Sequence, residues 1–157
     1  MAINPNTTFV ANAVLPASQM NRLPFGIVAQ GTRTVTESSL IVVTAEVTVT
    51  SSAFTAIANR YYKITFYEPE LSSPSTGYMQ MRILKGTTVF GTQIQAGTAI
   101  NGNGTTTYGQ GQCVAYTTLT AGSQQVCGSL ECSAGTGKAG AGSTNFAFIL
   151  VEDIGPA

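Results

Sequence analysis

The 157-residue sequence has no histidine and a single aspartate, Asp153. Histidine is the usual general base and the commonest metal ligand, so its absence removes the common Ser and Cys triads and most metal sites. The adjacent Glu152 would lie on the opposite face of a strand, which places the two carboxylates badly for paired acid–base catalysis and suggests a charged strand end at the surface. We therefore expect no enzymatic activity and no catalytic, cofactor-binding or metal-binding residues.

Charge is also scarce: seven Lys and Arg balance seven Asp and Glu, and charged residues make up only 9% of the chain. No basic run is present, which argues against nucleic acid or anionic lipid as a partner. No apolar run is long enough to span a membrane. The start, Met1 to Pro5, does not read as a signal peptide, so we expect folding in the cytoplasm. Either Thr and Ser simply coat a neutral surface, or much of that surface is buried in an assembly; we favour the assembly.

Residues that suit strands and turns dominate what remains, with 17 Gly, six Tyr and seven Phe, while good helix formers are scarce. The length fits one domain. About eight short strands, separated by turns every ten residues or so, predict an all-β domain over residues 25–157, namely a jelly-roll-like antiparallel β-sandwich. Residues 68–75 are predicted to be a loop, and residues 113–119 to form a hairpin with 124–132.

The first 24 residues lack strand alternation and are punctuated by Pro5, Pro16 and Pro24. Residues 16–22 can form one or two helical turns with a proline early in the helix. We interpret residues 1–24 as a docking arm with a short helix, the alternative being a frayed terminus. Its candidate docking residues are the apolar ones, Phe9, Leu15, Met20, Leu23 and Phe25.

The closing segment, residues 145–155, is apolar on both faces of a predicted strand. Phe146, Phe148 and Leu150 alternate with Ala147, Ile149 and Val151. Because side chains alternate between the faces of a strand, we expect this strand to be buried on both sides, inside the domain or against another subunit. The candidate core or interface residues are Phe146, Phe148, Ile149, Leu150 and Val151.

The cysteines and four of the tyrosines are two further groups that could form a functional site. Cys113, Cys127 and Cys132 match no zinc signature, and buried free thiols are favoured over a bridge between Cys113 and Cys132. Four tyrosines can be read either as an aromatic platform for a sugar or, as we prefer, as packed strand aromatics; they are Tyr61, Tyr62, Tyr67 and Tyr78.

Several phrases of the sequence, in their order, resemble tailed-bacteriophage virion proteins. The arm reads Leu-Pro-Ala-Ser-Gln-Met-Asn at residues 15–21, followed by Leu-Pro-Phe-Gly-Ile-Val at 23–28. An Arg-Tyr-Tyr-Lys-Ile strand at 60–64, a hairpin phrase at 82–89 and the ending Val-Glu-Asp-Ile-Gly-Pro at 151–156 follow. The resemblance is to small structural proteins of phages of Gram-positive actinobacteria. Residues 68–77 and the cysteine-bearing hairpin depart from this pattern.

The resemblance implies a compact jelly-roll-like domain, usually trimeric, mounted on a capsid or tail. We therefore expect a non-enzymatic virion component that decorates the capsid or belongs to the tail or its fibres. Its expected partners are copies of itself, which the resemblance implies form a trimer, and virion proteins such as the major capsid or tail proteins. The alternative is a carbohydrate-binding receptor module of the tail, with a host-surface glycan as partner.

Overall fold

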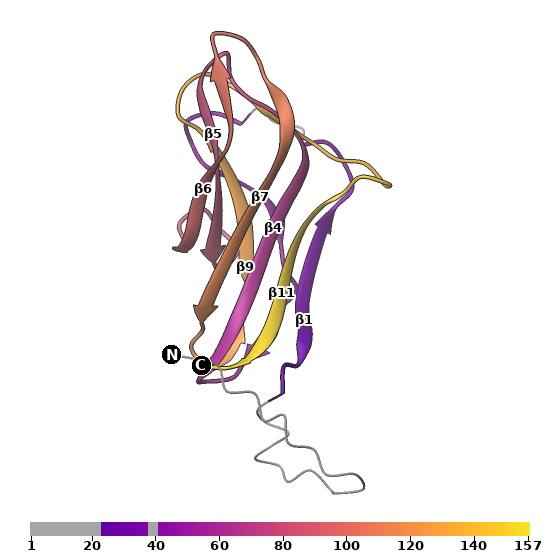
Figure 1. Cartoon of the computed structure of the whole chain (residues 1–157), viewed down its shortest axis with the longest axis vertical. Helices are drawn as coiled ribbons and strands as arrows, with labels where there is room; N and C mark the ends of the chain where they lie inside the picture. Colours follow the sequence, from indigo (N-terminus) through magenta and orange to yellow (C-terminus); the bar gives the residue numbers. More distant parts are fainter. Residues whose placement is uncertain (1–22, 38–40) are drawn as a thin grey trace, which may run out of the picture.

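The computed structural model describes residues 23–37 and 41–157, and every regular element in them is a β-strand (Figure 1). The predicted short helix and the candidate docking residues Phe9, Leu15 and Met20 lie outside the described residues. The strands are β1 Gly26–Arg33, β2 Glu46–Thr50, β3 Phe54–Ala56, β4 Arg60–Ser72, β5 Thr76–Lys85, β6 Thr92–Asn103, β7 Tyr108–Thr118, β8 Gly122–Gln124, β9 Val126–Cys132, β10 Lys138–Gly140 and β11 Ala147–Pro156.

Two antiparallel sheets account for most of the domain. The first sheet has the order β1-β11-β4, with β7 on the other side of β4 and β10 pairing with the far end of β4. The second has the order β2-β9-β5-β6, and β3 pairs separately with β8. The predicted all-β, jelly-roll-like antiparallel sandwich is therefore confirmed.

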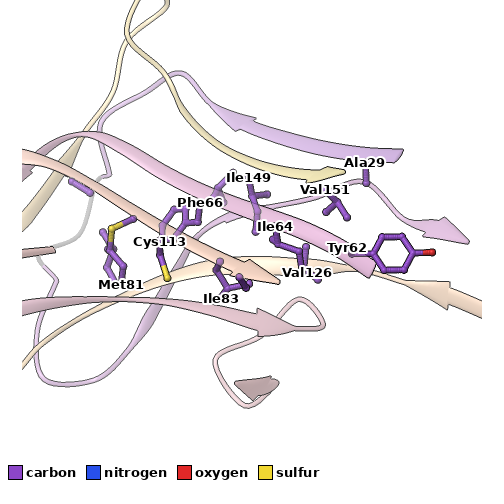
Figure 2. Packing of buried hydrophobic residues seen from close by; sticks show 14 of the residues in the cluster. Ala29, Tyr62, Ile64, Phe66, Met81, Ile83, Cys113, Val126, Ile149 and Val151 are labelled. Carbon is purple, nitrogen blue, oxygen red and sulfur yellow. The ribbon is translucent and has the colours of Figure 1, made fainter. Parts of the chain in front are cut away.

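The core lies between the two sheets, as Figure 2 shows. Alternation along β4 points Tyr62, Ile64 and Phe66 inward, where they are at most 1% exposed. They pack in one cluster with residues of the second sheet such as Ile83 and Val126. Burying an apolar side chain of this size contributes about 1.5–3 kcal/mol, so this layer supplies most of the fold's stabilisation.

A glycine sets the distance between the sheets at the centre of this core. Gly128 of β9 is buried, and a Cβ added to it would lie 2.5–2.7 Å from three carbons of the Phe66 ring. Real Cβ atoms do not approach so closely. The ring of Phe66 therefore occupies the volume that any larger residue at position 128 would need.

Both ends of the described chain lie at one end of the sandwich. The Ala157 amide donates to the Asn59 carbonyl at 2.8 Å, and an Arg60 guanidinium nitrogen donates to the Leu23 carbonyl at 2.6 Å. Figure 1 shows the start of β1 and the C-terminus together at the lower end, with the β4–β5 and β6–β7 turns at the opposite, upper end. We call these the basal and distal ends.

The loop predicted at residues 68–75 is wrong for residues 68–72, because β4 continues to Ser72, whereas residues 73–75 do connect β4 to β5 outside the strands. The strand tolerates Pro69 because its pairing with β7 shifts register between Glu68 and Leu71. A proline has no N–H for the ladder and is accommodated at such a bulge. Beyond the bulge β4 regains a partner on its other side, β10.

The predicted cysteine hairpin is also wrong. Cys113 of β7 pairs with Phe66 in the first sheet, whereas Cys127 and Cys132 belong to β9 in the second sheet. The chain between them crosses from one sheet to the other through β8.

Candidate functional site: the outer face of the first sheet

The side of the first sheet that points away from the core carries continuous cross-strand rows. One row joins Gln30, Leu150, Thr65 and Val114 across β1, β11, β4 and β7. Opposed residues share a face and lie about 4.5–5.5 Å apart at Cβ. The other rows place Ile27, Thr32, Lys63, Tyr67, Gln112, Tyr116, Phe148 and Glu152 on the same side. We call this set, together with Phe146, the outer face.

Aromatic rings form the centre of the outer face. The Tyr67 and Phe148 ring centroids are 5.3 Å apart, and those of Phe146 and Phe148 are 6.2 Å apart. Beside them is a shallow hollow of about 200 Å³, lined by Gln30, Thr32, Phe146, Phe148, Ile149 and Leu150. Phe146 is 42% exposed and Tyr116 67% exposed. Covering such a surface would release about 25 cal/mol for each Å² of apolar area.

The outer face carries almost no charge. Its rows contain only Lys63 and Glu152, whose side chains pair with each other at 3.0 Å. The hydrogen bond and the negative charge of Glu152 raise the pKa of Lys63, and the opposite charges of the two side chains leave the pair without net charge. The outer face therefore offers no charge pattern that would select a strongly charged partner.

The alternative that β11 is buried on both faces inside the domain is wrong, whereas burial of its outer face against another subunit stays a prediction. Ile149 and Val151 face the core and are fully buried, but Phe148 and Leu150 are only partly covered. The physical reason is that no described element lies over the outer side of the first sheet. Ile149 and Val151 are therefore core residues, while Phe146, Phe148 and Leu150 stay candidates for an interface.

At the basal end, a buried ion pair holds the first described residues. Arg60 and Asp153 are 5% and 1% exposed at their side chains, and a second Arg60 nitrogen donates to Asp153 Oδ1 at 2.6 Å. The Arg60 guanidinium also lies 4.1 Å from the centre of the Phe25 ring, a cation–π contact, and binds the Leu23 carbonyl. Asp153 is thus not the surface strand end that was expected.

We call Arg60, Asp153, Phe25 and Leu23 the basal clamp. Of the predicted docking residues, Leu23 and Phe25 are the two that the structure describes, and they are 38% and 50% exposed. The clamp orients them where the predicted arm joins the domain, while leaving much of their apolar surface open.

Sequence reasoning missed a second buried polar group. Glu68 is fully buried, accepts a hydrogen bond from Thr48 Oγ1 at 2.6 Å, and pairs with Arg33 at 2.6 Å. Desolvation raises the pKa of Glu68, although Thr48 and Arg33 act in the opposite direction. The cluster joins β1, β2 and β4, and so links the two sheets. The inward parity of Tyr62, Ile64 and Phe66 extends to residue 68 and could have revealed it.

The four tyrosines do not form one platform. Tyr62 is 1% exposed and its hydroxyl accepts the Ile57 amide, Tyr61 and Tyr67 lie on the other side of β4, and Tyr78 belongs to the second sheet. Their separation follows from strand alternation.

The cysteines are buried free thiols in the described structure. Burial raises the pKa of Cys127 to about 11 and also raises the pKa values of Cys113 and Cys132. Residues 23–37 and 41–157 contain no group of three or more Cys, Asp or Glu arranged to hold a metal ion. Over the same residues, no helix has the length and hydropathy needed to cross a membrane.

Comparisons with known proteins return likenesses of shape only. No family model matches the sequence, and no curated protein matches it. Among solved structures, Eiger TNF from S. frugiperda aligns with a TM-score of 0.48 and 9% identity over 84% of this chain and 95% of that one. A carbohydrate-binding module from Cellvibrio mixtus lichenase 5A, in complex with cellotriose, gives 0.33 and 13% over 80% and 96%.

The enzymatically active domain of bacteriophage CBA120 tailspike protein 4 is also similar, with a TM-score of 0.33 and 13% identity over 77% of this chain and 19% of that chain. The structural neighbours therefore include a TNF-like domain, a carbohydrate-binding module and a phage tailspike. At TM-scores below 0.5, none of these likenesses carries a functional argument.

Proposed function

We propose that this protein is a non-enzymatic structural component of a tailed-phage virion, a homo-oligomer, most simply a trimer, that decorates the capsid or forms part of the tail or its fibres. The observation that carries the proposal is the outer face. It is an apolar, aromatic-centred and nearly uncharged sheet surface that no described part of the chain covers.

A second copy of the chain is the occupant that best fits this surface. The only charges in its rows are paired within one chain, so two copies meet without like-charge repulsion. The formal net charge of the whole chain is zero, which further favours self-association. The partly exposed side chains of Phe148 and Leu150, with the hollow beside them, give neighbouring copies both projections and a recess to pack against.

The virion assignment is supported by the sequence phrases at 15–28, 60–64, 82–89 and 151–156 that resemble phage structural proteins. The structure adds a physical role to two of them. Arg60 and Asp153, from the second and the last phrase, form the basal clamp on the first described residues. In the proposed assembly the clamp fixes the direction in which the arm leaves the domain toward the capsid or tail protein that it contacts.

The assembly is tested by placing a charge in the outer face. Leu150→Lys should convert the oligomer to a monomer, because assembly would desolvate a lysine on this face without giving it a partner. Light scattering coupled to size exclusion measures the mass, and unchanged far-UV circular dichroism shows that the variant is folded. Thr98→Lys adds the same charge at an exposed position of β6 and should leave the oligomer intact. A monomeric parent protein, or equal masses for parent and Leu150→Lys, would refute the assembly.

Location is tested separately by immunogold labelling and mass spectrometry of purified phage particles. The proposal expects stoichiometric protein on the head or the tail. Its absence from intact particles would overturn the virion assignment, whatever the oligomeric state.

A further inference from the structure

An open groove is lined in part by Ser72, Thr106 and Tyr108, which lie at or beside the β4–β5 and β6–β7 turns of the distal end. Figure 1 shows these turns at the end opposite the C-terminus. The volume of the groove is about 390 Å³, and it opens where β4, β7 and β10 reach their distal ends. The side chains that give it chemical character are Glu70, Ser72, Thr106, Tyr108, Thr136 and Lys138. None of them belongs to the outer face or to the clamp.

The central row of the groove combines three kinds of contact. Ser72 of β4 pairs with Lys138 of β10 on one side and with Tyr108 of β7 on the other. A cation, a hydroxyl and an aromatic ring therefore stand side by side across two interstrand spacings, about 10 Å. Tyr108 is 73% exposed, so its ring face is open to a ligand.

A glycine makes space for the carboxylate of the groove. Glu70 pairs with Gly140 across β4 and β10, and a Cβ at position 140 would lie 2.8 Å from both Cδ and Oε2 of Glu70. The side chain of Glu70 therefore lies against the bare backbone of β10. Any larger residue at 140 would push the carboxylate away from this position.

Hydrogen bonds hold the floor and one wall of the groove. Ser72 Oγ accepts the Lys138 amide at 3.1 Å, so its hydroxyl proton remains available to donate elsewhere. The β4–β5 and β6–β7 turns are joined twice, by the Ser73 amide to the Thr107 carbonyl at 2.8 Å and by the Thr107 amide to Ser73 Oγ at 3.0 Å. The groove is thus formed before a ligand arrives, which lowers the entropic cost of binding.

We propose that this groove binds a neutral saccharide. Sugar hydroxyls both donate and accept, and the groove offers Glu70 as acceptor, Lys138 as donor, and the hydroxyls of Ser72, Thr106 and Thr136 as both. The apolar face of a sugar ring stacks on an aromatic ring such as Tyr108. One carboxylate and one ammonium give the groove no net charge, which disfavours an anionic ligand. Its hydroxyl-rich lining disfavours an apolar one.

Saccharide binding in this groove does not require the proposed assembly. The groove is the candidate site for the alternative function, glycan recognition. β4 runs from Arg60 of the clamp to Ser72 of the groove, so the two sites lie at opposite ends of this strand. A domain mounted at its basal end would therefore present the groove outward.

The test uses the full chain and trisaccharides of glucose, galactose and mannose, each beside a uronic acid counterpart, with isothermal titration and saturation-transfer NMR. At least one neutral trisaccharide should bind, and Tyr108→Ala should weaken it by about tenfold, equivalent to about 1.4 kcal/mol. Tyr78→Ala is the matched control, because this tyrosine is 39% exposed on β5 but lies outside both the groove and the outer face. Its affinity should match the parent.

A second pair of variants tests the carboxylate. Gly140→Ala should weaken binding by displacing Glu70, whereas Gly142→Ala, which meets no atom within 4 Å, should not. Circular dichroism checks that all variants are folded. The proposal is overturned if no trisaccharide binds at millimolar concentration, if Tyr108→Ala and Tyr78→Ala bind alike, or if uronic acid forms bind more tightly than neutral ones.

Discussion

Replacing Gly128 by alanine tests how closely the two sheets approach each other. The added methyl would lie 2.5–2.7 Å from three carbons of the Phe66 ring, whereas carbon atoms normally rest about 3.5–4.0 Å apart. The ring must therefore retreat by about 1 Å. Phe66 is 0% exposed and packed against both sheets, so no free space receives it.

Overpacking of this kind typically costs about 1–3 kcal/mol, and alanine recovers about 0.5–1 kcal/mol of backbone entropy relative to glycine. We expect a net loss of about 1–2 kcal/mol, which for a domain of this size lowers Tm by about 2–8 °C. Urea denaturation followed by far-UV circular dichroism, at one fixed protein concentration, measures it. The concentration must be fixed because association adds to apparent stability.

Gly97→Ala is the matched control, because a Cβ there meets nothing within 4 Å and the residue lies in β6 without a positive φ. It should be neutral or slightly stabilising. Adding Phe66→Leu to Gly128→Ala should relieve the overlap and give a favourable coupling energy above about 0.5 kcal/mol. If Gly128→Ala is as benign as Gly97→Ala, or the coupling is zero, Phe66 does not pack over Gly128 and the described sheet spacing is wrong.

Three further predictions concern β11, the clamp and the thiols. Ile149→Ala should cost about 2–5 kcal/mol of unfolding free energy because its side chain is fully buried; Phe148→Ala should cost clearly less in dilute, dissociated protein, and equal losses would place both in the core. Arg60→Met should cost about 3–5 kcal/mol because it leaves a buried carboxylate without its counter-ion, while Lys63→Met at the solvent-exposed pair should cost far less; similar losses would contradict the buried clamp. Cys127 has its pKa raised to about 11, so folded protein at pH 8 holds almost no thiolate there and should react with Ellman's reagent only after denaturation; rapid reaction in the folded state would refute its burial.

Local alternation predicted the strands well where one face is apolar. In β4 the pattern of Tyr62, Ile64 and Phe66 identified both the strand and its inward face. The same reasoning could not decide β11, because both of its faces are apolar and the covering of the outer one depends on what lies beyond the chain. Which strands pair with each other was harder still to predict. Cys113 and Cys132 seemed adjacent because neighbouring strands often form hairpins, but here the chain changes sheets between them.

The polar sites escaped prediction for a different reason. The groove combines Glu70, Tyr108 and Lys138, which are distant in sequence and meet only because β10 pairs with the end of β4. The Gly/Ala/Ser-rich composition of residues 133–143, which include β10, is typical of a loop and gave no sign of a strand. The clamp likewise needs Arg60 and Asp153 to be brought together by the β4–β11 ladder, and single charged residues give no sign of their distant partners.

The neutrality of the outer face determines how an assembly built on it responds to its surroundings. Dissolved salt screens the attraction between charges. On this face the one ion pair, Lys63 with Glu152, forms within a single chain, so a change in salt concentration should weaken the attraction between copies very little. Cooling acts on the other component, because hydrophobic attraction declines as temperature falls. Cohesion between copies should therefore be indifferent to ionic strength and most vulnerable in the cold.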